Sequence, residues 1–252
     1  LSFLISCRNL MMTENDVKQK ADRLPNKVVK IEDALARLES NTTFLIGGFG
    51  ERGFPFWLVH GVKEQPLKNL TLIKSDANET GIGIAHLINE GMVKKLICSH
   101  CGLNRELIEE VNAGRMDLDI VPQGILAERI RAGGSGIPAF LTDIGIGTVF
   151  EQGKTMVKLD GATFLLERAI KGDVALLKAY RADTYSNLIY KNVARNFNPL
   201  MAMAADLVIV EAEEVYELGQ IPANEVGTSG IFVDMVVPVP AISREEAIRR
   251  GM

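Results

Sequence analysis

Three glycine-rich segments are the parts of the sequence whose residue types suit the binding of a large anionic ligand. They are Gly47–Pro55, Arg131–Pro138 and Gly145–Thr148. Glycines let backbone amides approach an anion closely, and the N-terminus of a following helix adds a favourable dipole. The first segment lacks the Gly-Lys-Ser/Thr ending of a P-loop. Glycines between a strand and a helix also serve tight turns, so the three segments favour a phosphate-bearing ligand only in combination.

Two cysteines with a C-x-x-C spacing, Cys98 and Cys101, are a second candidate for chemistry, because this spacing occurs in redox and zinc sites. A zinc site needs two further ligands, and the nearby His86 and His100 do not complete a familiar ligand spacing. Cys98 lies in an apolar run, which favours its burial as a small hydrophobic side chain. We therefore expect no metal site.

The composition limits the classes of protein to consider. The 252 residues are 47% hydrophobic, which is ordinary for a globular chain and unlike a disordered one. The chain has 28 Lys and Arg and 32 Asp and Glu, so its net charge is −4. A negative net charge argues against nucleic-acid binding. No apolar run has the length needed to cross a bilayer, so no membrane association is expected. Three cysteines cannot form a closed set of disulfides, which favours a reducing, cytoplasmic location.

Alternating strand-like and helix-like segments must position these residues. The expected strands are 43–46, 70–73, 93–98 and 119–121, and the expected helices are 31–38, one from Pro55, 84–90, 105–113 and 125–132. Short apolar strands that alternate with helices predict an α/β fold, with an open, mostly parallel sheet covered by helices on both faces. After Gly133 the pattern changes to short strands and turns, which predicts a β-rich inserted section. A further helix at 199–205 and a strand at 207–210 follow.

The chain divides into three expected segments. Residues 1–27 are expected to be disordered or to derive from upstream or vector sequence, because Met11-Met12 resembles a true start more than Leu1 does. Residues 28–240 are expected to form the α/β domain. Residues 241–252 are expected to be a charged tail, either a frayed, solvated helix or part of a contact between subunits.

A series of short motifs resembles the family I coenzyme A transferases, in the same order along the chain. The motifs are Asn41–Phe49 with Gly53 and Pro55, Ser99–Asn104, Val121–Gly124, Glu128–Arg131, Gly133–Gly136, Gly145–Val149, Ala194–Pro199 and Gly230–Val233. The resemblance extends from about Val28 to about Val237 and is strongest for the alpha subunit of acetate or acetoacetate (3-oxoacid) CoA-transferases. It implies an open α/β transferase fold, the movement of coenzyme A between carboxylic acids, and partnership with a separate beta subunit.

The nucleophile that the resemblance implies is absent from this sequence. In the family, a glutamate within a Ser-Glu-Asn-Gly motif attacks the thioester and then carries coenzyme A, and this motif belongs to the beta subunit. This sequence contains no such motif, and its loop glutamates lack the expected neighbours; they are Glu51, Glu79, Glu90, Glu128 and Glu225. We therefore expect no catalytic residue in this chain, which would supply half of a composite active site in a heterotetramer or a larger assembly.

The resemblance also implies two groups of binding residues. The first group is expected to contact coenzyme A and consists of Gly47, Gly48, Phe49, Gly50, Glu51, Arg52 and Gly53. The second group is expected to line the acyl pocket and consists of Ser99, His100, Asn104 and Gln123. An anhydride mechanism needs no proton abstraction by histidine, so a structural hydrogen bond is expected for His100. Gln123 either faces the substrate or only occupies a turn after Pro122, and Asn198 is expected to cap the following helix.

The acid that accepts coenzyme A is left open by one departure from the family. The 3-oxoacid transferases often carry polar residues after the proline, whereas this chain has Phe56-Trp57. The candidates are acids of the acetate, acetoacetate, succinate or butyrate class, with coenzyme A and acyl-CoA as substrates and no tightly bound cofactor. Two other functions remain open: a sugar-phosphate isomerase or deaminase of similar fold, and a non-catalytic ligand-sensing subunit whose glycines are only structural.

Overall fold

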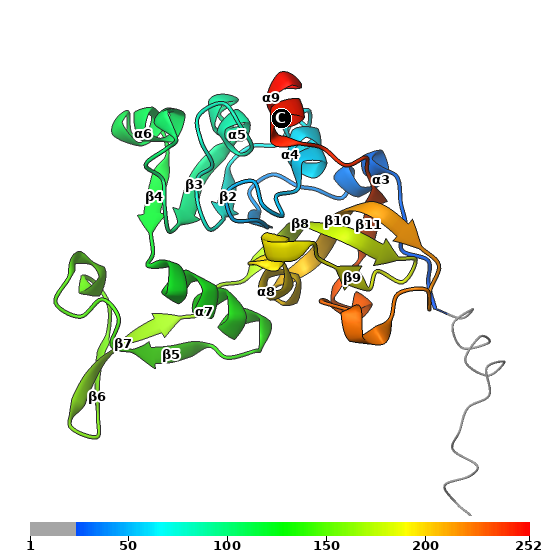
Figure 1. Cartoon of the computed structure of the whole chain (residues 1–252). Coiled ribbons are helices and arrows are strands. Elements are labelled where there is room, and N and C mark those ends of the chain that lie inside the picture. The colour runs from blue at the N-terminus through cyan, green and yellow to red at the C-terminus, as the bar shows by residue number, and fades with distance from the viewer. Residues whose placement is uncertain (1–23) are drawn as a thin grey trace, which may run out of the picture.

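The computed structural model describes residues 24–252, and its centre is an eight-stranded sheet (Figure 1). The main path of the sheet has the order β11-β10-β8-β1-β2-β3-β4, and every neighbouring pair along it is parallel. These strands are Thr43–Ile46 (β1), Leu70–Ile73 (β2), Val93–Cys98 (β3), Asp117–Ile120 (β4), Gly172–Asp183 (β8), Ala205–Tyr216 (β10) and Met235–Pro238 (β11). Leu188–Ile189 (β9) pairs antiparallel with β8. The expectation of an open, mostly parallel sheet is confirmed.

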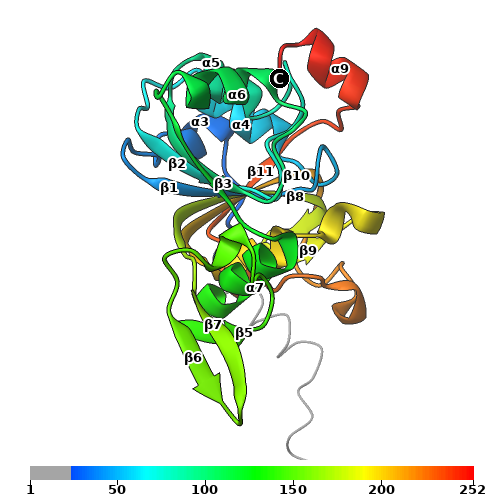
Figure 2. The same ribbon diagram turned by 90° about the vertical axis from the view of Figure 1, so that its left-hand side faces the viewer.

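Helices cover both faces of the sheet (Figures 1 and 2). One face carries Ile31–Leu35 (α3), Phe56–Lys63 (α4), Ala85–Asn89 (α5), Arg105–Asn112 (α6) and Arg244–Arg249 (α9), and the other carries Gln123–Gly134 (α7) and Asn198–Met203 (α8). Single turns of 3-10 helix lie in the connections, at Val149–Glu151 (η2), Asn192–Arg195 (η3), Ala223–Glu225 (η4) and Gly230–Phe232 (η5). Within residues 24–252, none of the helices combines the length and apolar character needed to span a bilayer.

Each central strand contributes to two cores, because successive side chains of a strand point to opposite faces. In β1, Phe44 and Ile46 pack beneath α3–α6, while Leu45 packs against α7 and α8. In β2, Leu72 packs in the same core as Phe44, and Ile73 packs in the same core as Leu45. This two-sided burial explains why β1 and β2 are mostly apolar and carry no charged residue.

A second, three-stranded antiparallel sheet extends away from the main sheet, next to α7 (Figure 2). Its strand order is β5-β7-β6, and its strands are Ala139–Thr142 (β5), Met156–Leu159 (β6) and Ala162–Arg168 (β7). This sheet is the β-rich section expected after Gly133.

The described part of the chain begins at residue 24 and includes the C-terminal end. Most of the segment 1–27, which was expected to be disordered or foreign, lies outside the described residues. The segment 241–252 carries α9, and Ala247 and Met252 are buried in the main core. The expectation of a frayed, solvated helix for this tail is therefore wrong, because Ala247 and Met252 fix the helix on the domain.

The carboxyl ends of the parallel strands meet at one edge of the sheet, which is where open α/β proteins bind ligands. The segments that leave this edge are Gly47–Pro55 after β1, residues 74–84 after β2, Ser99–Asn104 after β3, and residues 121–122 after β4. Helix α7 begins at Gln123, two residues earlier than expected, so Gln123 is the first residue of a helix and not part of a turn.

Candidate functional site

The segment after β1 forms a tight turn at the sheet edge. The backbone NH of Phe49 donates to the carbonyl of Arg52 at 3.0 Å, and the NH of Arg52 donates to the carbonyl of Phe49 at 3.1 Å. Gly50 lies between them with a φ of +56°, a conformation that glycine adopts at little cost. Phe49 is 51% exposed, so the turn presents an aromatic side chain to the solvent.

A buried ion pair after β2 holds this turn. Lys74 is wholly excluded from solvent, and its Nζ lies 3.0 Å from Asp76 Oδ1 and 3.3 Å from the carbonyl oxygen of Gly50. The NH of Gly50 donates to Asp76 Oδ2 at 2.7 Å. Asn78 Nδ2 also donates to the Gly50 carbonyl, at 3.1 Å. The residues after β2 therefore satisfy both backbone polar groups of Gly50.

The charges of this pair are strongly influenced by burial. Burial lowers the pKa of Lys74, and the Asp76 carboxylate opposes this shift. Burial alone would raise the pKa of Asp76, but the Lys74 ammonium, the Ser75 hydroxyl and the NH groups of Gly50 and Asn78 outweigh it and hold the pKa below its usual value. Asp76 therefore remains a carboxylate that fixes the turn.

Sequence inspection did not select Lys74, Asp76 or Asn78. The signal that identifies them is a polar run directly after the apolar strand Leu70–Ile73, at the edge where ligands bind in this class of fold. The glycines of the sequence indicate the turn itself and not the neighbouring loop that supports it.

The base of the turn packs against Asn198, the first residue of α8, which is buried. Asn198 Nδ2 donates to the carbonyl of Gly53 at 3.1 Å, and its Oδ1 accepts from the NH of Lys178 at 3.1 Å. A Cβ on Gly47 would lie 2.1 Å from Asn198 Oδ1. The expectation that Asn198 caps its own helix is wrong, because its side chain joins two neighbouring segments.

A cavity of about 190 Å³ lies between the turn and the segments after β2, β3 and β4. It is lined by Phe49, Gly50, Glu51, Ser75, Asp76, Asn78, Glu79, His100, Leu103 and Gln123. We refer to it as the Phe49 cavity. Residues chosen from the sequence in three separate segments therefore surround one cavity, and they are Phe49, Gly50, Glu51, His100 and Gln123.

Asn104 was expected to line the acyl pocket, but the structure assigns its side chain to the fold. Asn104 is fully buried, and its Oδ1 accepts from the NH of Leu107 at 2.9 Å, which caps α6. Its Nδ2 donates to the carbonyl of Ala77 at 2.7 Å. All of these bonds are internal, so Asn104 is corrected from a substrate-lining residue to a structural one.

Three other predicted residues do not line the Phe49 cavity but contact the segments that do. Ser99 donates its hydroxyl to the carbonyl of Ser75. Gly48 has a φ of +101°, and its carbonyl accepts from Ser75 Oγ at 3.0 Å. Gly47 packs against Asn198 as described above. These residues shape the backbone behind the site.

A second cavity, of about 290 Å³, also borders the turn and contains the remaining predicted residues, Arg52 and Gly53. Its wall includes Lys178 and Lys191 as further cations, and Lys191 Nζ lies 4.9 Å from the ring centroid of Tyr180. The wall also contains Glu51 and Glu213, and Lys178 Nζ lies 3.0 Å from Glu213 Oε1. Arg52 and Lys191 are therefore the cations of this cavity that suit an anionic group.

Glu211 of β10 lies behind this second cavity and is fully buried. Its Oε2 accepts from the NH of Leu58 at 3.0 Å, so it satisfies a free NH in the first turn of α4. Its Oε1 lies 3.6 Å from Lys178 Nζ. Burial raises the pKa of Glu211 to about 7, and Lys178 opposes this shift.

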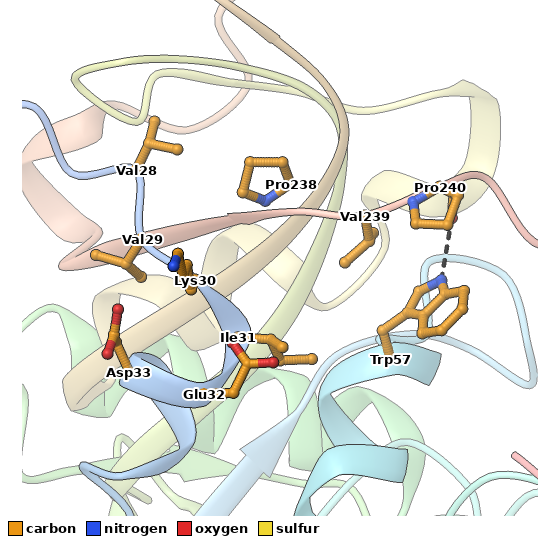
Figure 3. A pocket seen from close by; sticks show the side chains of 10 residues that line it. All are labelled: Val28, Val29, Lys30, Ile31, Glu32, Asp33, Trp57, Pro238, Val239 and Pro240. Atoms are coloured by element: carbon orange, nitrogen blue, oxygen red, sulfur yellow. Dashed lines mark hydrogen bonds between the residues drawn. The ribbon is translucent and has the colours of Figure 1, made fainter.

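A larger cavity of about 680 Å³ lies between the start of α3 and the end of β11 (Figure 3). Its charged residues, Lys30, Glu32 and Asp33, are all exposed, and the rest of its wall is apolar apart from the Trp57 indole NH. That NH donates to the carbonyl of Pro240 at 3.0 Å. With no buried charged side chain to orient a ligand, this cavity is a weaker candidate than the Phe49 cavity.

The C-x-x-C pair does not form a disulfide, and both thiols are free. Cys98 is buried, and burial raises the pKa of its thiol to about 12, so the reactive thiolate is strongly disfavoured. Within residues 24–252, no group of three or more His, Cys, Asp or Glu side chains is placed to hold a metal ion.

The sequence matches the model of the family described as "Coenzyme A transferase" over residues 28–238. The chain is 42% identical to the alpha subunit of the acetate CoA-transferase of Escherichia coli K12, covering 85% of this chain and 97% of that protein. It is 44% identical to one subunit of the 3-oxoadipate CoA-transferase of Acinetobacter baylyi, covering 83% and 92%. It is 41% identical to one subunit of a probable succinyl-CoA:3-ketoacid coenzyme A transferase of Bacillus subtilis, covering 82% and 87%.

Solved structures share the fold at lower identity. The acyl-CoA transferase YdiF of E. coli O157:H7, as a thioester complex with CoA, superposes with a TM-score of 0.78 at 22% identity, covering 88% of this chain and 48% of that chain. The chain therefore spans about half the length of YdiF. Glutaconate coenzyme A-transferase of Acidaminococcus fermentans gives a TM-score of 0.78 at 21% identity, covering 85% and 76%.

Proposed function

The chain belongs to the coenzyme A transferase family, and on that premise we propose that it is the alpha subunit of a short-chain acyl CoA-transferase. The enzyme would move coenzyme A between carboxylic acids of the acetate, acetoacetate, succinate or butyrate class. The single observation that carries this proposal is the Phe49 cavity, in which the glycine turn after β1 meets His100 and Gln123 from the next strand ends. Relatives named for three different acids leave the preferred acid open.

The nucleophile is proposed to be a glutamate of a separate beta subunit. Its carboxylate attacks the thioester carbonyl, and the C–S bond breaks to give an acyl-glutamyl anhydride and coenzyme A thiolate. The thiolate attacks the glutamyl carbonyl, which releases the first acid and leaves a glutamyl-CoA thioester. A second acid reverses both steps and departs as its CoA thioester, so every bond and charge is balanced.

Two observations support this division of roles. The relatives are named as single subunits of their enzymes, one of them as the alpha subunit, and the YdiF chain is about twice as long as this one. Of the glutamates near the turn, Glu51 and Glu79 are both paired with Arg244, and Glu211 is buried against Leu58 and Lys178. None of these three is a free carboxylate held next to the open space of the Phe49 cavity.

The proposed contribution of this chain is to bind and orient the substrates. The Gly50–Glu51 part of the turn and the exposed Phe49 ring would contact the thioester end of coenzyme A. His100 and Gln123 would contact the acid, and Gln123 can donate two hydrogen bonds to a carboxylate. The second cavity would accept a phosphate of coenzyme A through Arg52 and Lys191.

The assembly proposed is a heterotetramer or a larger complex with the beta subunit, located in the cytoplasm. Coenzyme A and acyl-CoA act as substrates, and no tightly bound cofactor is proposed. The beta chain is expected to be encoded by the neighbouring reading frame and to contain Ser-Glu-Asn-Gly.

The test is to express this chain alone and together with that beta chain, and to assay transfer from acetyl-CoA to acetoacetate, butyrate and succinate. Transfer by the pair and none by this chain alone is expected. Gln123→Ala should raise the KM for the acid at least fivefold in the pair, whereas the exposed Gln152→Ala should not. Efficient transfer by this chain alone would contradict the division of roles. Binding of a phosphosugar without binding of coenzyme A would contradict the proposed activity.

A further inference from the structure

The segment after β11 crosses back over the molecule and is anchored at several points. Trp57, in the first turn of α4, donates its indole NH to the carbonyl of Pro240 at 3.0 Å (Figure 3). Farther along, the guanidinium of Arg250 lies 5.3 Å from the centroid of the same indole ring. Both ends of this segment therefore contact one side chain. We call residues 239–252 the strap.

The helix within the strap is fixed on the domain. Ser243 Oγ accepts from the NH of Glu246 at 3.2 Å, which caps α9. Ala247 and Met252 are buried, and the NH of Gly83 donates to the carbonyl of Met252 at 3.2 Å. Because contacts precede and follow it, the first residue of α9, Arg244, has a defined position.

Arg244 bridges two carboxylates of the Phe49 cavity. Its Nε lies 3.3 Å from Glu51 Oε1, in the glycine turn, and its Nη2 lies 2.6 Å from Glu79 Oε2, after β2. Both glutamates line the cavity. The third carboxylate of the lining, Asp76, is already paired with the buried Lys74. Arg244 is therefore the side chain that offsets the remaining negative charge.

We propose that Arg244 is a positioning residue that sets the charge of the Phe49 cavity and so allows an anionic acid to enter. With Arg244 in place, the group of Glu51, Glu79 and Arg244 carries one net negative charge, and without it the group carries two. Like charges within a few ångströms repel an incoming carboxylate, and a dicarboxylate is repelled more than a monocarboxylate. This inference deepens the proposed function and rests on it, because it assigns the Phe49 cavity to the acid.

The size of the effect is limited by solvent. The side chain of Arg244 is 44% exposed, and that of Glu79 is 47% exposed. Exposed charges are screened by water and salt, so the effect is expected to be several-fold and to weaken at high ionic strength.

The experiment compares Arg244→Gln with Arg244→Lys in the assembled enzyme at low ionic strength. Arg244→Gln should raise the KM for succinate about five- to tenfold and the KM for acetate about two- to threefold. The kcat should stay within twofold. The KM for acetyl-CoA should rise less than the KM for succinate, because the acetyl group is uncharged and only one of the two glutamates, Glu51, also lines the second cavity. Arg244→Lys keeps the positive charge and should recover most of the succinate KM, and so should Glu79→Gln added to Arg244→Gln.

The matched control is Arg249→Gln, on the same helix, since Arg249 pairs with Glu246 and not with the cavity glutamates. It should leave every constant within twofold. Trp57 is the only tryptophan of this chain, so its fluorescence in the full chain reports whether the strap stays docked. Equal changes in kcat and in both KM values, or a shift of Trp57 emission in Arg244→Gln, would assign Arg244 a merely structural role and overturn the inference.

A binding measurement separates this inference from the proposed activity. Calorimetric titration of the full chain with succinate should show weaker affinity for Arg244→Gln than for the original chain. If the chain binds succinate and the assembled enzyme transfers no coenzyme A, the proposed activity fails and the Arg244 comparison still stands. If transfer occurs and Arg244→Gln binds and uses succinate normally, the inference fails alone. If the original chain neither binds nor uses any acid, both fail.

Discussion

Lys74 Nζ and Asp76 Oδ1 lie 3.0 Å apart beneath the glycine turn, and the lysine is wholly excluded from solvent. Breaking a buried pair from one side leaves a charge without its partner, which costs about 3–5 kcal/mol in proteins. Lys74→Met should therefore lower the free energy of unfolding by about 3 kcal/mol, measured by urea denaturation. Lys95→Met is the control, because Lys95 and Asp119 are 3.8 Å apart and exposed, so the loss should stay below about 1 kcal/mol. Equal losses in the two variants would contradict the role given to the buried pair.

The close approach of Asn198 to Gly47 predicts a steric effect. In Gly47→Ala the new Cβ would lie 2.1 Å from Asn198 Oδ1, so the asparagine must move and lose its bonds to Gly53 and Lys178. We expect a loss of about 2–3 kcal/mol in the free energy of unfolding. Gly124→Ala, in α7, meets no atom within 4 Å and should be neutral or stabilising. A Gly47→Ala variant as stable as the original chain would refute the packing argument.

Asn104 provides a test of a structural role against a binding role. Asn104→Ala removes the cap of α6 and leaves the carbonyl of Ala77 without its donor, so a loss of about 2 kcal/mol is expected. The KM for both substrates of the assembled enzyme should change less than twofold. Asn112→Ala, at the exposed end of the same helix, should alter stability by less than about 0.5 kcal/mol. A large rise in the KM for the acid without a loss of stability would restore Asn104 to the substrate pocket.

Burial of Glu211 predicts a specific dependence of stability on pH. Its pKa is raised to about 7 in the folded chain, against a usual value of 4.5. The folded state therefore binds the proton more tightly, so the contribution is full below about pH 4.5 and is lost as the pH rises to about 7. A pKa difference of this size corresponds to about 3 kcal/mol.

The measurement is the free energy of unfolding of the original chain and of Glu211→Gln at pH 5, 6, 7 and 8. The original chain should lose about 2.5 kcal/mol relative to the variant between pH 5 and 8. Glu213→Gln removes the other carboxylate that faces Lys178, and it should keep the pH dependence of the original chain. A pH-independent difference between Glu211→Gln and the original chain would show that Glu211 is ionised throughout.

Much of the fold could be predicted because its information is local. The apolar runs at Thr43–Ile46 and Leu70–Ile73 are too short and too continuous for surface helices, and helical spacing follows each of them. Parallel pairing then follows, since a helix separates each strand from the next. With the strands parallel, the glycine turn, His100 and Gln123 must reach the same edge of the sheet.

The sequence by itself therefore determined the fold class, the family and the edge that carries the candidate site. Only the tertiary structure decided which polar side chains face the cavity and which serve the fold. His100 and Asn104 lie in one short loop, yet Asn104 turns inward because the carbonyl of Ala77, 27 residues away, needs a donor. Arg244 reaches Glu79 across 165 residues, and Glu211 reaches Leu58 across 153. Such pairings depend on how segments that are distant in the sequence pack in the folded chain, and no local pattern of residue types encodes this packing.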